Sequence, residues 1–191
     1  LKMSGQLIFD NGQLRVGAAV GVGPEALERA QRLRAHKVDV VVIDTAHGDT
    51  ESVLQTIRDI KDAWRDQDVV AGNISEPESV DRLIKAGADG IKVGQGPGSI
   101  CTTRKVAGVG CPQVTAVYQC SVVAEKAGIP VCADGGLVYS GDIVVAIAAG
   151  AHSVMMGKML AGTKEAPGEV VFLQGQQLKK YRGMGSLGVM S

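Results

Sequence analysis

The sequence contains few aromatic residues, with two Phe, three Tyr and one Trp among 191 residues. It also lacks an excess of positive charge, because 20 Lys and Arg are balanced by 20 Asp and Glu. Proteins that bind nucleic acid use aromatic side chains to stack bases and basic surfaces to meet phosphates. There is no apolar run near the ~20 residues of a membrane span, and no signal-peptide pattern begins at Leu1. We therefore expect no nucleic-acid partner, no membrane contact and a cytoplasmic location.

Cysteine is also scarce. Cys101, Cys111, Cys120 and Cys132 fall at irregular spacings, which argues against a disulfide framework or a C-x-x-C zinc site. No His, Cys, Asp or Glu spacing is typical of a transition-metal site either. Cys120 lies in a helical pattern and Cys132 in an apolar run, so we interpret both as small buried hydrophobic residues. Only Cys101 has the sequence surroundings of a reactive thiol.

The chain is 45% hydrophobic, which suffices for one core. Extended apolar runs alternate with helical patterns at a pitch of roughly 25 residues, and this alternation predicts an α/β fold with a parallel sheet. The predicted strands are 15–22, 38–44, 68–73, 90–94, 129–134 and 153–157. The predicted helices are 24–36, 51–64, 77–86, 114–127 and 140–149.

Two segments repeat one pattern, a helix end that turns into a strand finishing on glycine: residues 86–94 and residues 149–157. This repetition favours a closed (β/α)8 TIM barrel over a doubly wound sheet, although it is compatible with both. Since a complete barrel needs eight strands and about 250 residues, we expect about six of the eight units here. We interpret residues 15–191 as this partial catalytic barrel and residues 1–14 as a leftover N-terminal or linker segment.

Polar residues follow the predicted strands at the points where each strand ends. Asp44 and His47 follow the second strand, Asn73 the third, and Asp134 the fifth. In a barrel these positions converge on the face that carries active sites. Each has an alternative explanation, because an Asp after a strand is often a helix cap and His47 could be an ordinary loop residue.

The segment 94–104 reads GQGPGSICTTR and is the most informative part of the chain. Its glycines and proline favour tight turns that present Cys101 beyond a predicted strand, so we interpret Cys101 as a candidate nucleophile. The connection between residues 95 and 113 is long for a β-α loop, which normally takes about 2–6 residues. Arg104 could lower the pKa of the thiol. The alternative is an inert loop cysteine.

The last two predicted strands end on Asp134-Gly135-Gly136 and on Gly157-Lys158. In barrels the loops after strands seven and eight commonly hold a phosphate group, often at a helix N-terminus. These residues therefore predict a phosphorylated ligand, with plain turn chemistry as the alternative.

Six motifs together carry a family resemblance: residues 94–104, 108–113, 44–48, 71–73, 133–136 and 180–186. With them, the chain from about Arg15 to Ser191 resembles the IMP dehydrogenase / GMP reductase family. The resemblance implies NAD-dependent oxidation of IMP to XMP, a step of guanine nucleotide biosynthesis. It further implies that Cys101 attacks C2 of the purine, that a hydride leaves for NAD⁺, and that the resulting thioimidate is hydrolysed. A covalent adduct is chemistry suited to a reactive cysteine.

The same resemblance assigns residues to each part of the reaction. Catalysis involves Cys101, with Thr103 beside the thiol. IMP is expected at Ser99, Asp134, Gly135, Gly136, Gly157, Lys158, Tyr181, Gly183, Met184 and Gly185. NAD is expected at Asp44, Thr45, Ala46, Asn73, Gly94, Gln95 and Gly96. A potassium ion is expected on the backbone carbonyls of Gly96, Gly98 and Cys101. The family is also homotetrameric.

The sequence departs from the family in two ways. Lys158 stands where a small residue is expected, and no residue here is assigned to the Arg-Tyr pair that activates the hydrolytic water. Alternatives are therefore kept. These are GMP reductase, which converts GMP to IMP with NADPH, an inactive nucleotide-binding or assembly fragment, and a flavin-dependent barrel oxidoreductase. The segments 44–47 and 181–186 favour the dehydrogenase.

Overall fold

A computed structural model describes residues 14–183 of the chain. Six strands form one sheet in which every neighbouring pair is parallel and the spatial order follows the chain order. The strands are β1 (Gly17–Val20), β2 (Val40–Asp44), β3 (Asp68–Ile74), β4 (Gly90–Val93), β5 (Val131–Asp134) and β6 (Ser153–Met155). Because a doubly wound sheet reverses its strand order, this sequential order is that of a barrel.

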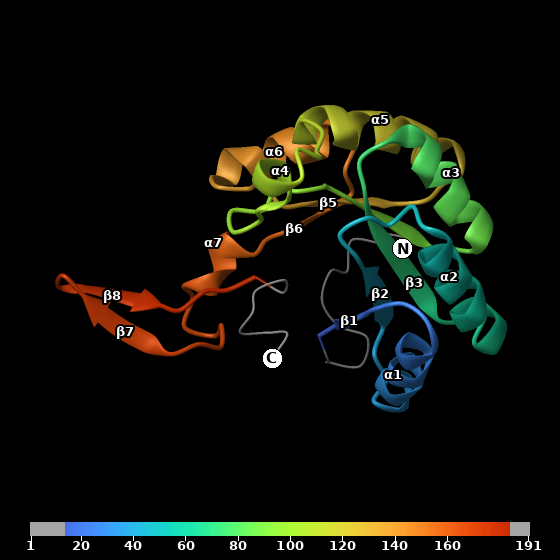
Figure 1. Cartoon of the computed structure of the whole chain (residues 1–191), viewed down its shortest axis with the longest axis horizontal. Coiled ribbons are helices and arrows are strands. Elements are labelled where there is room, and N and C mark those ends of the chain that lie inside the picture. The colour runs from blue at the N-terminus through green and yellow to red at the C-terminus, as the bar shows by residue number, and fades with distance from the viewer. Residues whose placement is uncertain (1–13, 184–191) are drawn as a thin grey trace.

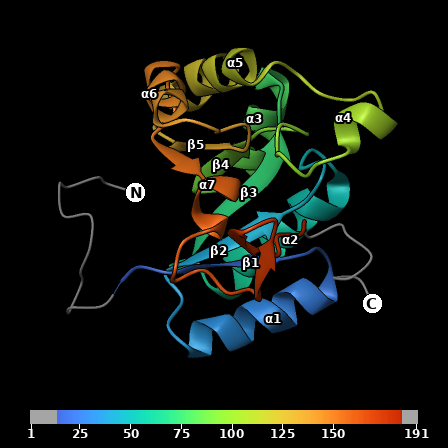
Figure 2. The ribbon, with the colours of Figure 1, turned by 90° about the vertical axis from the view of Figure 1, so that its left-hand side faces the viewer.

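Five helices connect the strands and cover the outer side of the curled sheet (Figure 1). They are α1 (Pro24–Ala35), α2 (Glu51–Ala63), α3 (Pro77–Ala86), α5 (Gln113–Lys126) and α6 (Ser140–Ala148). Figure 2 shows the strands from a second side, with α1 at one end of the row of helices and α5 and α6 toward the other. The six predicted strands and five predicted helices are thus confirmed, with ends that differ by up to two residues.

Local sequence explains where the helices begin. Pro24 and Pro77 occupy the first turns of α1 and α3, where a missing N–H costs nothing. Thr50 caps α2, because its hydroxyl oxygen accepts a hydrogen bond from the backbone N–H of Val53 at 3.4 Å. No helix among residues 14–183 has both the length and the apolar character needed to cross a membrane.

The core lies between the helices and the convex face of the sheet. It is built mainly from aliphatic side chains of the central elements, such as Ile43, Ile57, Leu83 and Ile91, all fully buried. The whole of β4 is buried, and this strand includes a lysine, Lys92. Burial of such side chains contributes about 1.5–3 kcal/mol each, so the central strands and the helices packed on them supply most of the hydrophobic stabilisation.

Three elements were absent from the sequence prediction. Two are short helices, α4 (Thr103–Val106) and α7 (Lys158–Ala161). The third is an antiparallel hairpin of β7 (Val170–Leu173) and β8 (Gln176–Lys179), which projects away from the sheet in Figure 1. Gln174 and Gly175 form its two-residue turn, both with positive φ, as a type I′ turn requires.

Candidate active site

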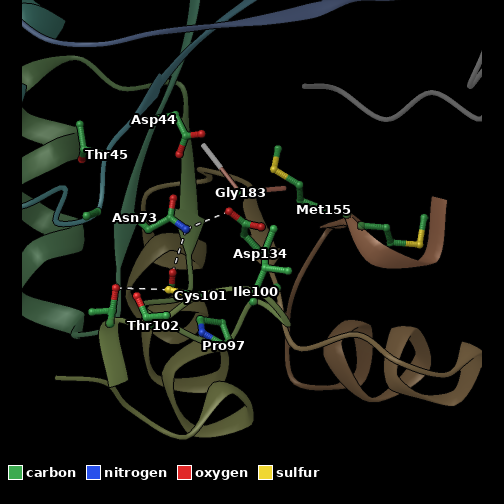
Figure 3. A pocket seen from close by; sticks show the side chains of 18 of the residues that line it. Asp44, Thr45, Asn73, Pro97, Ile100, Cys101, Thr102, Asp134, Met155 and Gly183 are labelled. Carbon is green, nitrogen blue, oxygen red and sulfur yellow. Dashed lines mark hydrogen bonds between the residues drawn. The ribbon is translucent and has the colours of Figure 1, made fainter. Parts of the chain in front are cut away.

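A cavity of about 940 Å³ opens at the carboxyl ends of the strands. Many of the residues that sequence analysis selected line it: Asp44, Thr45, Ala46, Asn73, Gly94, Gly96, Gly98, Cys101, Thr103, Asp134, Gly135, Gly157, Tyr181 and Gly183. Figure 3 shows Asp44, Asn73, Asp134 and Cys101 around this one space. The parallel register explains the convergence, because Asp44 lies opposite Gly72 and Asp134 opposite Met155 at the same edge of the sheet.

Other predicted residues lie elsewhere. Ser99, Gln95, Gly136 and Lys158 do not line the cavity. Lys158 begins the short helix α7, so its side chain is not among those facing the space where a phosphate was expected. Met184 and Gly185 lie outside the described residues.

The cavity also has walls that sequence analysis did not assign to the site: Pro97, Ile100, Thr102, Met155 and Met156. Arg182, which lies in the motif 180–186 that was expected at the nucleotide, lines it as well. Met155 ends β6, and Met156 follows it. The rule that selected Asp44 and Asp134, a residue at a strand end, would have found both methionines. Polarity guided the selection instead, and a ligand site is largely apolar.

Cys101 lies on the cavity wall with a half-buried thiol. A tight turn sets its place, since its backbone N–H donates to the carbonyl of Gly98 at 3.0 Å. The thiol donates to the hydroxyl oxygen of Thr103 at 3.2 Å. Thr103 therefore lies beside the thiol, as the resemblance implied, and its hydroxyl fixes the direction of the sulfur.

Arg104 ties the two ends of the cysteine loop together. Its Nε donates to the carbonyl of Gln95 at 3.1 Å, and its Nη2 donates to the carbonyl of Cys111 at 2.5 Å. Its side chain packs so closely on Gly110 that a Cβ there would lie 2.6 Å from Nε. Both of these hydrogen bonds of the guanidinium are with loop carbonyls, which makes Arg104 a structural clamp of the loop.

A buried lysine, which sequence analysis did not select, lies under the polar wall of the cavity. Lys92 is 1% exposed, and its Nζ donates to Asp44 Oδ1 at 2.7 Å and to Asp134 Oδ2 at 2.6 Å. Burial alone would lower the pKa of Lys92, but the charges and hydrogen bonds of Asp134 and Asp44 raise the pKa above its ordinary value. The lysine is therefore cationic at neutral pH. The sequence feature that could have identified Lys92 is its place as the one charged residue in the otherwise apolar strand β4, because a buried charge needs a partner.

Asn73 extends this network toward the cysteine loop. Its Nδ2 donates to Asp134 Oδ2 and to the carbonyl of Gly94, both at 2.8 Å. Its Oδ1 is buried and has no hydrogen-bond partner within residues 14–183. Since a buried polar atom without a partner is costly, this oxygen is an available acceptor for a bound ligand.

Gln95 lies behind the cavity and supports the loop from below. Its Oε1 accepts a hydrogen bond from the Ser75 hydroxyl at 2.6 Å, and its Nε2 bonds to His47 Nδ1 at 2.6 Å. These two bonds fix the orientation of the amide. Gln95 was predicted to contact the dinucleotide, but the structure gives it a supporting position.

Three carbonyl-bearing residues predicted to hold a cation, Gly96, Gly98 and Cys101, all lie in the loop that lines the cavity. The carbonyl of Gly98 accepts the N–H of Cys101 and keeps a second lone pair. No cluster of three His, Cys, Asp or Glu side chains suited to a metal occurs in residues 14–183. A hard monovalent cation would thus be held here by backbone oxygens, which is chemistry that these residues fit.

The sequential parallel sheet and the cavity at its carboxyl edge, with the Cys101 thiol on its wall, define a β/α-barrel protein with a candidate site on the face where barrels carry their active sites. Residues 5–191 match the family model described as the IMP dehydrogenase / GMP reductase domain. The chain therefore belongs to the IMP dehydrogenase / GMP reductase family, and its curled sheet is part of a (β/α)8 barrel.

Individual relatives agree with the family. The chain is 58% identical over 180 residues to the inosine-5′-monophosphate dehydrogenase of Aquifex aeolicus, covering 94% of this chain and 37% of the relative. It is 56% identical to that of Chlorobaculum tepidum over 180 residues, covering 94% and 36%. It is 53% identical over 180 residues to the inosine-5′-monophosphate dehydrogenase of Bacillus subtilis, covering 94% of this chain and 37% of the relative. The chain thus spans a little over a third of the length of these curated relatives.

Proposed function

We propose that the protein containing this chain is an NAD-dependent IMP dehydrogenase, which oxidises IMP to XMP in guanine nucleotide biosynthesis. The observation that carries the proposal is the Cys101 thiol, directed by Thr103 on the wall of a cavity whose polar lining includes Asp44, Asn73 and Asp134. The names of the relatives support the choice of reaction.

In the proposed reaction the Cys101 sulfur, as thiolate, forms a bond to C2 of the purine. The hydride on C2 then leaves, and NAD⁺ would accept it. Water next adds to C2 of the thioimidate, the carbon–sulfur bond breaks, and XMP departs as Cys101 regains its proton. The sum is IMP, NAD⁺ and water giving XMP, NADH and one proton.

Within this proposal the described residues divide the cavity between two ligands. Asp134, Gly135, Gly157, Tyr181 and Gly183 hold the IMP side, and Asp44, Thr45, Ala46, Asn73, Gly94 and Gly96 hold the dinucleotide side. Carboxylate and amide oxygens accept hydrogen bonds from ribose hydroxyls, which suits Asp134 and Asp44 to these places. The carbonyls of Gly96, Gly98 and Cys101 hold a potassium ion, which neutralises carbonyl dipoles and steadies the loop.

Cys101→Ser in the full-length protein tests the proposal. Because a serine hydroxyl is far less acidic than a thiol, NADH production from IMP should fall at least about a thousandfold. IMP affinity, measured by calorimetry, should stay within about threefold, since the substitution is nearly isosteric. Retained turnover would remove Cys101 as the nucleophile.

GMP reductase is the second candidate, because the family model covers both activities. Assaying the unaltered full-length protein with IMP and NAD⁺, and separately with GMP and NADPH, distinguishes the two. Turnover with GMP and NADPH alone would overturn the proposal. Binding of IMP without turnover of either pair would instead support an inactive nucleotide-binding or assembly module. A homotetramer and a cytoplasmic location stay predictions.

A further inference from the structure

Lys92 connects β2 with β5, two strands that are not neighbours in the sheet. Only β5 lies next to its own strand, β4. Lys92 lies on β4, which pairs with β5, where Asp134 stands, whereas Asp44 ends β2 beyond β3. Its side chain passes the position of Gly72 on β3, where an added Cβ would lie 2.8 Å from the Cβ of Lys92. The absence of a side chain at Gly72 therefore leaves space for the Lys92 side chain, which extends past β3 to Asp44.

The bonds to Lys92 leave half of each carboxylate available. Asp44 uses Oδ1 for the lysine and Asp134 uses Oδ2, and no hydrogen bond to Asp44 Oδ2 or Asp134 Oδ1 occurs within residues 14–183. Both residues line the cavity. One buried cation thus fixes the orientation of two carboxylates and leaves one acceptor oxygen on each of them.

Without a cation between them, the two carboxylates would repel each other. Two carboxylates that share one site do not both ionise readily, because each raises the pKa of the other. The groups that face this region are Asp44 from β2, Asp134 and Cys132 from β5, and Arg182, which lines the same cavity. Lys92 forms an ion pair with each of the two carboxylates and so supplies a cation between them.

We propose that Lys92 is a positioning residue that orients Asp44 and Asp134 together and so couples the dinucleotide side of the cavity to the IMP side. This inference rests on the proposed function for the identity of the two ligands. When a ligand binds one of the two carboxylates, the hydrogen bond between Lys92 and the other carboxylate changes in strength. The affinity for each ligand therefore depends on the same buried side chain, although Lys92 itself does not line the cavity.

Lys92→Met in the full-length protein tests the coupling, because methionine removes the charge and keeps a similar volume. The Kd values of IMP and of NAD⁺, measured by calorimetry, should both rise at least about fivefold at pH 8, the lower end of ordinary coupling between sites. Both Kd values are measured again at pH 6, and Lys92→Met should bind each ligand more weakly than the unaltered protein at this pH as well. Lys92→Arg, which keeps the charge, should recover most of the affinity.

Lys61→Met is the matched control. Lys61 also forms a partly buried ion pair, with its Nζ 2.8 Å from Asp89 Oδ2, and it donates to the carbonyl of Gln67 at 3.0 Å. Neither partner lines the cavity. The control should lower the melting temperature but leave both Kd values and their pH dependence within about twofold, the effect of a substitution at an independent site.

The outcomes separate the two proposals. If the unaltered protein binds neither IMP nor NAD⁺, the proposed function is wrong. If it binds both and Lys92→Met binds them within about threefold at pH 8 and at pH 6, the positioning role is wrong. Should Lys92→Met not fold, Asp44→Asn reports on the same bridge. It should change the Kd of IMP at least about threefold, and an unchanged value would contradict the coupling.

Discussion

The four cysteines occupy environments that separate reactive from inert thiols. Cys120 is fully buried in α5, and burial raises the pKa of its thiol to about 12. Burial also raises the pKa of Cys132 on β5. Cys101 instead lines the cavity. Only a thiolate reacts readily with an alkylating reagent, so environment rather than residue type decides the order of modification.

Alkylation with iodoacetamide at pH 8, followed by peptide mass spectrometry, checks this order. Cys101 should be modified first and Cys120 last, because a pKa of about 12 leaves a thiolate fraction on the order of 10⁻⁴ at that pH. An excess of IMP should protect Cys101 and leave the rate at Cys111 unchanged. Modification of Cys120 as fast as Cys101 would contradict the order.

At the scale of elements, the strand-to-loop junction at Gly94 fixes where the cysteine loop begins. Gly94 has a φ of 143° and lies against the end of β5, where an added Cβ would collide with the carbonyl oxygen of Asp134. Gln113, at the start of α5, donates to that same carbonyl at 3.2 Å and to the carbonyl of Val93 at 3.0 Å. The beginning and the end of the loop are therefore held at one point.

Gly94→Ala should thus lower the free energy of unfolding by at least about 2 kcal/mol, through both backbone strain and the collision. Gly141→Ala is the control, because Gly141 lies in α6 with open space around its Cβ position. This second change should stabilise the protein by up to about 1 kcal/mol. Urea unfolding of both variants measures the difference, and equal effects would contradict the role of the junction.

Elements with strong periodicity were predictable from the sequence, and those formed by weak local signals were not. The helices α2 and α3 alternate buried aliphatic and exposed charged residues and begin at a Thr cap and a proline, so their positions follow from local rules. The strand β8 reads Gln-Gln-Leu-Lys, without the apolar alternation that marks a strand. It forms because the Gln174-Gly175 turn brings it against β7.

The residues at strand ends in the site were predictable from the sequence, whereas the buried partner of two of them was not. Strand ends converge in any barrel, which is why Asp44, Asn73 and Asp134 were found. Lys92 was not found, because its two partners lie 48 and 42 residues away and only the curvature of the sheet brings them to one nitrogen. Lys158, by contrast, was selected from its place after a strand, but it begins α7 and is not among the residues that line the cavity, so its contact with a phosphate stays a prediction.

For the whole molecule, the open sheet has two edges within the described residues. β1 and β6 each pair with one strand only. Large apolar side chains are exposed on α5 and α6, including Tyr118 and Val144, and the hairpin exposes Phe172 at 77%. Unpaired strand edges and exposed apolar patches favour association with other chains.

Residues 1–191 expressed by themselves should therefore elute from a sizing column at a mass well above 19.8 kDa. They should also bind a fluorescent dye that reports exposed apolar surface. A full-length relative, such as the inosine-5′-monophosphate dehydrogenase of Bacillus subtilis, should bind less dye per residue at the same concentration. A monomeric, dye-free 191-residue chain would contradict this expectation.

The packing of Arg104 on Gly110 also constrains the order in which this loop can change by mutation. A side chain added at Gly110 meets Nε and Cγ of Arg104, so such a change is harmful while the arginine is present. Once Arg104 is replaced by a shorter residue the space is free, but the carbonyls of Gln95 and Cys111 have lost their donor. Neither single step is neutral. Because Gly110 also has a φ of 158°, a side chain there is strained even when the arginine is gone, so a second substitution does not repair the first and both residues must be kept together for the loop to persist.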